Sequence, residues 1–237
     1  MRKPVLIFLS CVLFLGAAWA AAKPHVVTFG KWLPVKLFVG PSEDKSVDMK
    51  IRSLYVDGRL REFTTGEPHD ITDTLFVVRK AFRLNDWLPE DEEKAATAPP
   101  GQRTAHRWTW QRGGWLLVNR DTGRISSLNL PDFDPFYSAA SWYRDYVAYC
   151  GVSDNGEKLY AVVAQLGRKK PVLHKDLGPA HGGDMPDSEC PAPVWQRQPA
   201  RVLFAPIGGQ KLTFSVRGHA AGLATEPEPV EEQPIRN

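Results

Sequence analysis

Residues 141–165, SWYRDYVAYCGVSDNGEKLYAVVAQ, show the pattern of a β-hairpin. Two short apolar runs, at 146–152 and 159–165, flank the turn sequence Asp154-Asn155-Gly156. Asp-Asn-Gly between two runs rich in Val, Tyr and Ala is typical of a turn that joins two strands. The stretch therefore predicts two antiparallel β-strands joined by a short turn.

The same alternation of apolar runs and turn residues extends through most of the chain. Asp57-Gly58 separates runs at 51–56 and 60–65, and Gly208-Gly209 separates runs at 201–205 and 212–216. No stretch repeats apolar residues with helical spacing over three turns, which excludes a long helix. We expect further strands at 26–29, 35–39, 75–84, 106–111, 115–119, 124–130 and 172–174.

The composition agrees with this pattern. The 237 residues include 19 Gly, 20 Pro and 11% aromatic residues, so turns and bulky apolar side chains are both frequent. The predicted fold class is all-β and antiparallel, either propeller-like or a β-sandwich built from hairpins, with at least ten strands and little helix. A smaller barrel joined to a hairpin module is a further alternative.

A longer motif supports the propeller-like alternative. Ser141-Trp142 precedes a turn, and a strand containing Val147-Ala148-Tyr149 and then a polar hairpin follow it. Val194-Trp195, followed by Val202-Leu203-Phe204, repeats this order about fifty residues later, a period typical of propeller repeats. Over residues 137–217 the chain thus resembles TolB-type and WD40-like β-propeller blades. The resemblance implies a binding scaffold in the cell envelope, and it implies no catalysis.

The first 22 residues predict a secretory signal peptide. Arg2 and Lys3 form a basic start, residues 5–15 are apolar, and Ala18-Trp19-Ala20 fits the small-residue cleavage rule. An uncleaved membrane anchor and a lipid anchor at Cys11 are the alternatives.

The charge balance argues against nucleic-acid binding. Without Arg2 and Lys3 the 30 basic residues become 28, against 27 acidic residues, so the processed chain is nearly neutral. No other segment contains 18 consecutive apolar residues, so we expect no membrane span after signal cleavage. The expected location is secreted or periplasmic, and the expected partner is an envelope protein or a glycan.

Processing leaves two cysteines, Cys150 and Cys190. An exported chain meets an oxidising compartment, which predicts a disulfide between them; two separate thiols are the alternative. The β-rich domain is expected to span 23–219, with an exposed acidic and Pro-rich loop at 85–104. Residues 220–237 are expected to be a disordered Pro- and Glu-rich tail, because they have little apolar surface to bury.

One group of residues has the chemistry of a metal site. His69 lies near Asp70 and Asp73, and carboxylates that orient an imidazole are typical of metal centres and of general bases. His181 and Asp184, in a Gly-rich stretch, are a second candidate pair. The alternative for both segments is a polar loop between strands.

Another group interleaves aromatic and basic residues: Trp108, Trp110, Arg112 and Trp115. On an exposed strand, the Trp rings would stack on sugar rings and the Arg side chain would add charge, which predicts a ligand-binding face. The alternative is that the tryptophans pack in the core and the arginine covers its rim.

The remaining motifs favour a protein without catalysis. The nearest match to a serine-hydrolase nucleophile elbow surrounds Ser153, but it is one residue too long and contains a turn sequence. No cofactor motif is found, so no cofactor is expected. The preferred hypothesis is an exported binding or scaffold protein of the cell envelope. The alternative is an envelope hydrolase or metalloenzyme using His69, Asp70 and Asp73 with His181 and Asp184.

Overall fold

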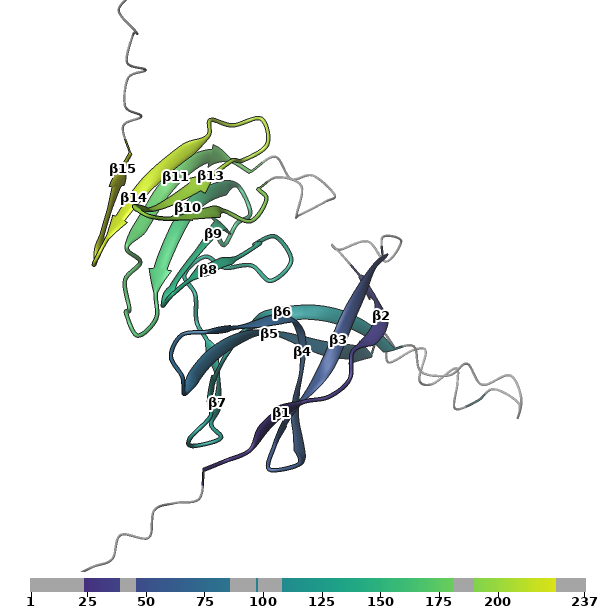
Figure 1. The fold of residues 1–237 in the computed structure, drawn as a ribbon. Helices are drawn as coiled ribbons and strands as arrows, with labels where there is room; N and C mark the ends of the chain where they lie inside the picture. Colours follow the sequence, from purple (N-terminus) through teal and green to yellow (C-terminus); the bar gives the residue numbers. More distant parts are fainter. Residues whose placement is uncertain (1–23, 39–45, 86–96, 98–107, 181–189, 225–237) are drawn as a thin grey trace, which may run out of the picture.

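A computed structural model describes residues 24–38, 46–85, 97, 108–180 and 190–224. These residues form fifteen β-strands in three sheets, and Thr97 is the one helical residue among them. The prediction of an all-β, antiparallel fold with at least ten strands is confirmed. Within the same ranges, no helix is both long and apolar enough to cross a membrane. Figure 1 shows the strands of residues 27–128 in one group and those of residues 141–223 in another.

The first sheet, which we call the barrel sheet, closes on itself. Strands β2 to β6 pair in sequence order, and β6 pairs back to β2 at Leu37 and Trp110. Closure through paired strands is the defining feature of a β-barrel. The closing pair is parallel because the ring has an odd number of antiparallel strands. The strands are β1 (Val27–Phe29), β2 (Leu33–Phe38), β3 (Ser46–Val56), β4 (Arg59–Asp70), β5 (Leu75–Asn85), β6 (Trp108–Asn119) and β7 (Ile125–Leu128).

The predicted hairpin at Asp57-Gly58 joins β3 to β4. Asp57 has φ 53° and Gly58 has φ 74°, as this type of tight turn requires. Asp57 also accepts hydrogen bonds from the Val26 backbone N–H, at 3.0 Å, and from His25 Nδ1, at 2.7 Å. These two hydrogen bonds lower the pKa of the Asp57 carboxyl. The turn therefore also holds the start of the described chain.

The Gly113-Gly114 pair differs from its prediction. We expected separate strands at 106–111 and 115–119, but β6 runs through both glycines. Arg79 pairs with Trp115 and Ala81 pairs with Arg112, so the glycines form a bulge opposite one residue, Lys80. A Cβ at Gly113 would lie 3.1 Å from the Lys80 Cβ, which explains the need for glycine at this close approach.

Two further sheets follow the barrel sheet, and each is an antiparallel meander of four strands. The second sheet contains β8 (Ser141–Tyr143), β9 (Tyr146–Val152), β10 (Lys158–Gln165) and β11 (Leu173–Pro179). The third sheet contains β12 (Val194–Arg197), β13 (Ala200–Phe204), β14 (Leu212–Arg217) and β15 (Ala220–Leu223). The hairpin predicted from residues 141–165 is the β9–β10 pair.

The second and third sheets pack face to face. One buried cluster joins Ala148 and Val163 of the second sheet to Phe204 and Phe214 of the third. The opposite face of the second sheet, including Tyr149, packs against the connecting segment 129–140. Both β-sandwiches and adjacent propeller blades stack antiparallel sheets in this way.

The disulfide between Cys150 and Cys190 is confirmed, with a Cα–Cα distance of 6.1 Å. Both cysteines are buried in the cluster between the second and third sheets. Cys150 lies on β9 and Cys190 lies shortly before β12. The bond therefore ties the start of the third sheet to the centre of the second.

The boundary of the predicted tail is wrong. Residues 220–223 form β15, which pairs with β14 through a turn at Gly218 and His219. His219 Nδ1 lies 2.9 Å from Gln165 Oε1, and the Tyr146 hydroxyl donates to the Gly218 carbonyl at 2.5 Å. These polar contacts hold a strand in which Leu223 is the one bulky apolar residue. Residues 225–237, and nearly all of the predicted loop at 85–104, lie outside the described residues.

Replacing either cysteine with Ser should lower the free energy of unfolding by about 4 kcal/mol, because the bond closes a long loop in the unfolded chain. The double variant should match either single variant, since one bond is lost once. Urea unfolding measures the change, and mass spectrometry without reductant reports the bond. Two free thiols in exported protein would contradict the assignment.

Two truncated chains should distinguish the contribution of β15 to stability from that of the residues after it. A chain that ends at Gly218 loses the β14–β15 pairing, and its melting temperature should fall by several degrees, at about 2–4 °C for each kcal/mol lost. A chain that ends at Ala224 keeps every described contact and should melt like the full chain. Differential scanning calorimetry compares them, and equal melting of the two truncated chains would show that β15 contributes nothing.

Candidate functional site

In the structure, the residues that were predicted to bind a metal form hydrogen bonds with different partners. His69 lies in β4, where a strand replaces the expected loop, and its Nε2 donates to the Arg144 carbonyl at 2.8 Å. Asp70 accepts a hydrogen bond from Arg120 Nη2 at 2.7 Å. Over the described ranges, no three His, Cys, Asp or Glu side chains gather as a metal site would require. His181 and Asp184 lie outside those ranges, so the metal site that joins them to His69 stays a prediction.

A shallow cavity of about 440 Å³ lies beside these residues, lined by Asp70, Ile71, Thr72, Asp73 and Arg120. Arg120 also donates to the Asp73 backbone carbonyl at 3.1 Å. The guanidinium is therefore engaged by two neighbours in the cavity wall, and the cavity offers no unengaged cation to an anionic ligand.

His69 and two tryptophans form a junction between the barrel sheet and the second sheet. The His69 ring stacks on Trp142 at 6.0 Å, and Trp115 meets Trp142 edge to face at 5.3 Å. Trp115 is only 9% exposed, so its ring packs in the interior, as in the alternative interpretation of the aromatic stretch. The residue stabilises the junction and is not available to stack on a ligand.

The other residues of the aromatic stretch do not join this junction. Trp110 is half-buried, packs edge to face on Phe63 at 5.1 Å, and lies 5.3 Å from the Arg83 guanidinium. Arg112 flanks the Gly113-Gly114 bulge. The side chain of Trp108 lies outside the described part. Of the predicted ligand-binding face, Trp110 is the one partly exposed tryptophan whose side chain the structure describes.

Arg79 connects the barrel sheet to the segment at 129–140. Its side chain is 9% exposed and donates to the Gly113 carbonyl at 3.2 Å, to Ser138 at 3.4 Å and to Pro135 at 2.6 Å. Its guanidinium also lies 5.5 Å from the Phe133 ring. A buried cation is stable only with such partners, so Arg79 fixes the path of the segment.

The described histidines and Ser153 do not form a nucleophile with its base. Ser153 Oγ accepts the Glu157 and Lys158 backbone N–H groups and donates to Asn155, so it closes a turn, as predicted. His174 pairs with Asp132 at 2.8 Å, but no hydroxyl or thiol is hydrogen-bonded to that pair among the described side chains. The other described histidines contact Asp57, the Arg144 carbonyl and Gln165.

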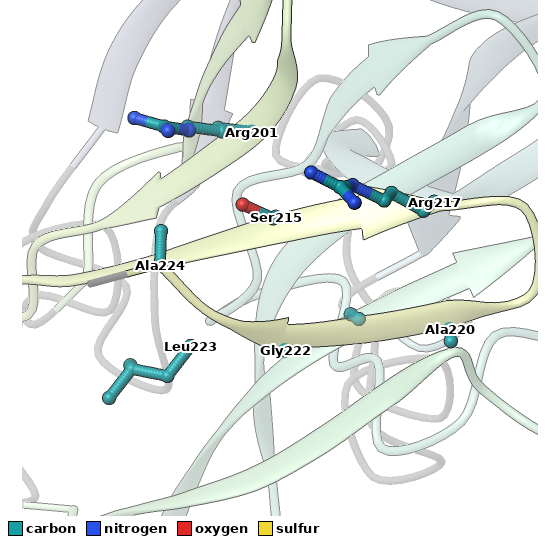
Figure 2. Close-up of a pocket in the computed structure, with 8 residues that line it drawn as sticks. Arg201, Ser215, Arg217, Ala220, Gly222, Leu223 and Ala224 are labelled. Carbon is teal, nitrogen blue, oxygen red and sulfur yellow. The ribbon is translucent and has the colours of Figure 1, made fainter. Parts of the chain in front are cut away.

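The sequence patterns did not predict a groove on the outer face of the third sheet. It has a volume of about 470 Å³ and is lined by Arg201, Ser215, Arg217 and five residues of 220–224. Arg201 pairs with Ser215 across β13 and β14, and Arg217 follows Ser215 by two residues, so the three side chains share a face. Figure 2 shows both guanidinium groups on one side of β14 with the Ser215 hydroxyl between them.

We name these residues the arginine groove. Ala220, Gly222 and Ala224 on β15 and just beyond it are small, so they leave space beside the two guanidinium groups. No carboxylate pairs with Arg201 or Arg217 in the part of the chain that the structure describes, and the buried Arg201 Nε has no hydrogen-bond partner there. The groove therefore presents two cations and a hydroxyl to solvent.

Arg79→Met should lower the free energy of unfolding by about 3 kcal/mol, because buried carbonyl acceptors lose their donors. Arg61→Met, at an exposed position on β4, is the matched control and should change it by less than about 0.5 kcal/mol. Urea unfolding followed by tryptophan fluorescence measures both. Equal effects of the two substitutions would contradict the role given to Arg79.

Comparison of the chain with protein-family models, with curated proteins and with solved structures finds no match. The likeness of residues 137–217 to propeller blades therefore depends on the residues alone. We therefore infer the function from the geometry of the described residues, among which the arginine groove is an open site that holds two cations.

Proposed function

We propose that the chain is an exported, non-catalytic binding protein of the cell envelope that holds an acidic polysaccharide in the arginine groove. One observation carries the proposal. Arg201 and Arg217 share an open groove with the Ser215 hydroxyl, and neither guanidinium has a carboxylate partner among the described residues. Two cations side by side repel each other, so a bound anion would stabilise the pair.

The chemistry of the groove favours carboxylate or sulfate groups. A guanidinium presents a planar fork of N–H donors that matches a carboxylate or sulfate, and the hydroxyl can bond a sugar oxygen. Diagonal neighbours across two strands lie roughly 7–8 Å apart, so Arg201 and Arg217 suit two anionic groups along one chain.

The shape of the groove favours a polysaccharide over a protein surface. Five of its eight lining residues are small, and Leu223, the one large apolar residue in the lining, is 65% exposed. A protein partner is usually anchored by a large side chain in an enclosed apolar pocket, and the groove offers no such pocket.

The disulfide supports export. Cysteine pairs persist as disulfides in secreted and periplasmic proteins and are rare in the cytosol. The signal-peptide pattern of residues 1–22 points to the same route. On this proposal the second and third sheets act as propeller-like blades, and the barrel sheet completes a scaffold that presents the groove.

The test is binding to immobilised polygalacturonate and dextran sulfate, with neutral dextran as the blank. Residues 23–237 should bind both acidic polymers, and the double variant R201A/R217A should bind at least about tenfold more weakly, since hydrogen bonds to charged groups contribute about 1.5–3 kcal/mol each. The matched control R59A/R61A removes the same charge from exposed positions on β4 and should bind nearly normally.

Three outcomes would overturn the proposal. Equal loss in both double variants would show that only net charge matters. No binding to either polymer would exclude an acidic polysaccharide of these two types. Preferential binding to polyglutamate over both polymers would assign the groove to an acidic protein partner.

A further inference from the structure

The row of groove residues continues onto β12, the edge strand of the third sheet. Gln196 lies directly opposite Arg201, and Arg201 lies directly opposite Ser215, so the three residues form one row across β12, β13 and β14. Gln196 is exposed, and its side-chain amide has no hydrogen-bond partner among the described residues. The amide N–H groups of Gln196 are therefore available to a ligand that lies in the arginine groove.

The next row on the same face of the sheet is apolar. Val194 lies directly opposite Leu203, and each is two residues from a member of the first row. Trp195 packs against the core between the second and third sheets, and Val202 lies inside that core. Because side chains alternate along a strand, Val194 and Leu203 face outward. Val194 is 59% exposed, and we call these two residues the apolar step.

The apolar step is small and lies close to the arginines. Alternate residues of a strand are about 6.6 Å apart, so Leu203 is about that far from Arg201 along β13. The same spacing separates Val194 from Gln196 along β12. Thr213 lies opposite Leu203 on β14, so a residue with a hydroxyl bounds the apolar surface there. A ligand held by Arg201 thus reaches both an amide and a short apolar surface.

An acetyl ester matches these groups. The carbonyl oxygen of the ester accepts hydrogen bonds, and the Gln196 amide can donate one. The methyl group of the ester is apolar, and contact with the apolar step removes it from water. Acetylation of a sugar hydroxyl leaves the acid group of the sugar unchanged, so carboxylates remain to pair with Arg201 and Arg217.

We propose that the arginine groove binds an acidic polysaccharide that carries O-acetyl groups, and that Gln196 and the apolar step hold an acetyl ester while the two arginines hold carboxylates. The inference rests on the proposed function, because it names the class of polysaccharide that the same groove binds. Arg217 and Leu203 lie on opposite sides of the row that contains Arg201 and Ser215. The polysaccharide therefore lies along β13 and β14, with the acetyl ester at the Leu203 end.

The test uses one galacturonate oligomer in two forms. Chemical acetylation of the sugar hydroxyl groups gives the first form. Mild alkali removes the esters and gives the second form, which has the same length and the same carboxylates. Residues 23–237 should bind the acetylated form about three- to fivefold more tightly, since burial of one methyl group favours binding by about fourfold. Isothermal titration calorimetry at low salt measures both affinities.

Three variants locate the acetyl ester. Val194→Ser, at an exposed position, should reduce the preference for the acetylated form to less than about twofold. Val47→Ser makes the same change at an exposed position on β3 and is the matched control, which should keep the preference. Gln196→Met removes the amide donors at similar length and should also reduce the preference. Neither Val194→Ser nor Gln196→Met should change the affinity for the de-esterified form.

Two results would overturn the inference at the apolar step itself. An undiminished preference for the acetylated form in the Val194→Ser variant would place the ester elsewhere on the molecule. A dimer of the parent chain in sedimentation velocity that the Val194→Ser variant dissociates would assign the apolar step to a second copy of the chain.

The affinities for the two forms distinguish failure of the inference from failure of the proposed function. If both forms bind with equal affinity and the R201A/R217A variant loses both, the proposed function stands and the acetyl ester is excluded from the site. If neither form binds to the parent chain, both proposals fail. Equal binding of both forms by the parent and by R201A/R217A would also overturn both, because the groove would then hold neither carboxylate nor ester.

Discussion

The hydrogen bonds of the buried Arg79 guanidinium hold the two halves of this fold together. The side chain comes from β5, bonds the Gly113 carbonyl in the bulge of β6, and reaches the Pro135 and Ser138 carbonyls of the connecting segment. The same segment is held from the other side, because the Ser138 hydroxyl donates to the Cys150 carbonyl and the Tyr149 hydroxyl donates to Pro131. Burial raises the pKa of Tyr149, so its hydroxyl stays a donor. Without Arg79, the barrel sheet and the second sheet would be joined mainly through Trp115, Trp142 and His69.

The position of the arginine groove depends on the contacts between the second and third sheets. The disulfide joins β9 of the second sheet to the start of the third, and the shared core places Phe214 and Val216 of β14 inward. Because side chains alternate along a strand, Ser215 and Arg217 must then face outward. β15 adds small residues beside them, and the chain leaves the sheet next to both cations. The packing that buries one face of the third sheet thus determines which charged side chains lie on the other face.

Local signals predicted much of the fold. Asp57-Gly58 and Asp154-Asn155-Gly156 are local turn signals, and the two cysteines outside residues 1–22, Cys150 and Cys190, have one possible bond between them. Gly113-Gly114 was wrongly predicted to separate two strands, because glycines occur in both turns and β-bulges. Only the pairing of β5 with β6 distinguishes the two. β15 was missed because cross-strand pairing and contacts from Tyr146 and Gln165 hold it, and these partners are distant in sequence. Arg201 lies 14 residues before Ser215, so their proximity depends on the β13–β14 register.

If Arg201 and Arg217 bind an acidic polysaccharide directly, as we propose, the Nε–Hε NMR signals of these two side chains report the binding. A short oligogalacturonate is titrated into the ¹⁵N-labelled chain at low salt, and arginine side-chain and backbone shifts are followed together. We expect the Hε signals of Arg201 and Arg217 and the Ser215 amide signal to shift first and to saturate with one affinity. Shifts that centre instead on Trp110 and Arg83 of the barrel sheet, with the signals of Arg201 and Arg217 unchanged, would contradict it.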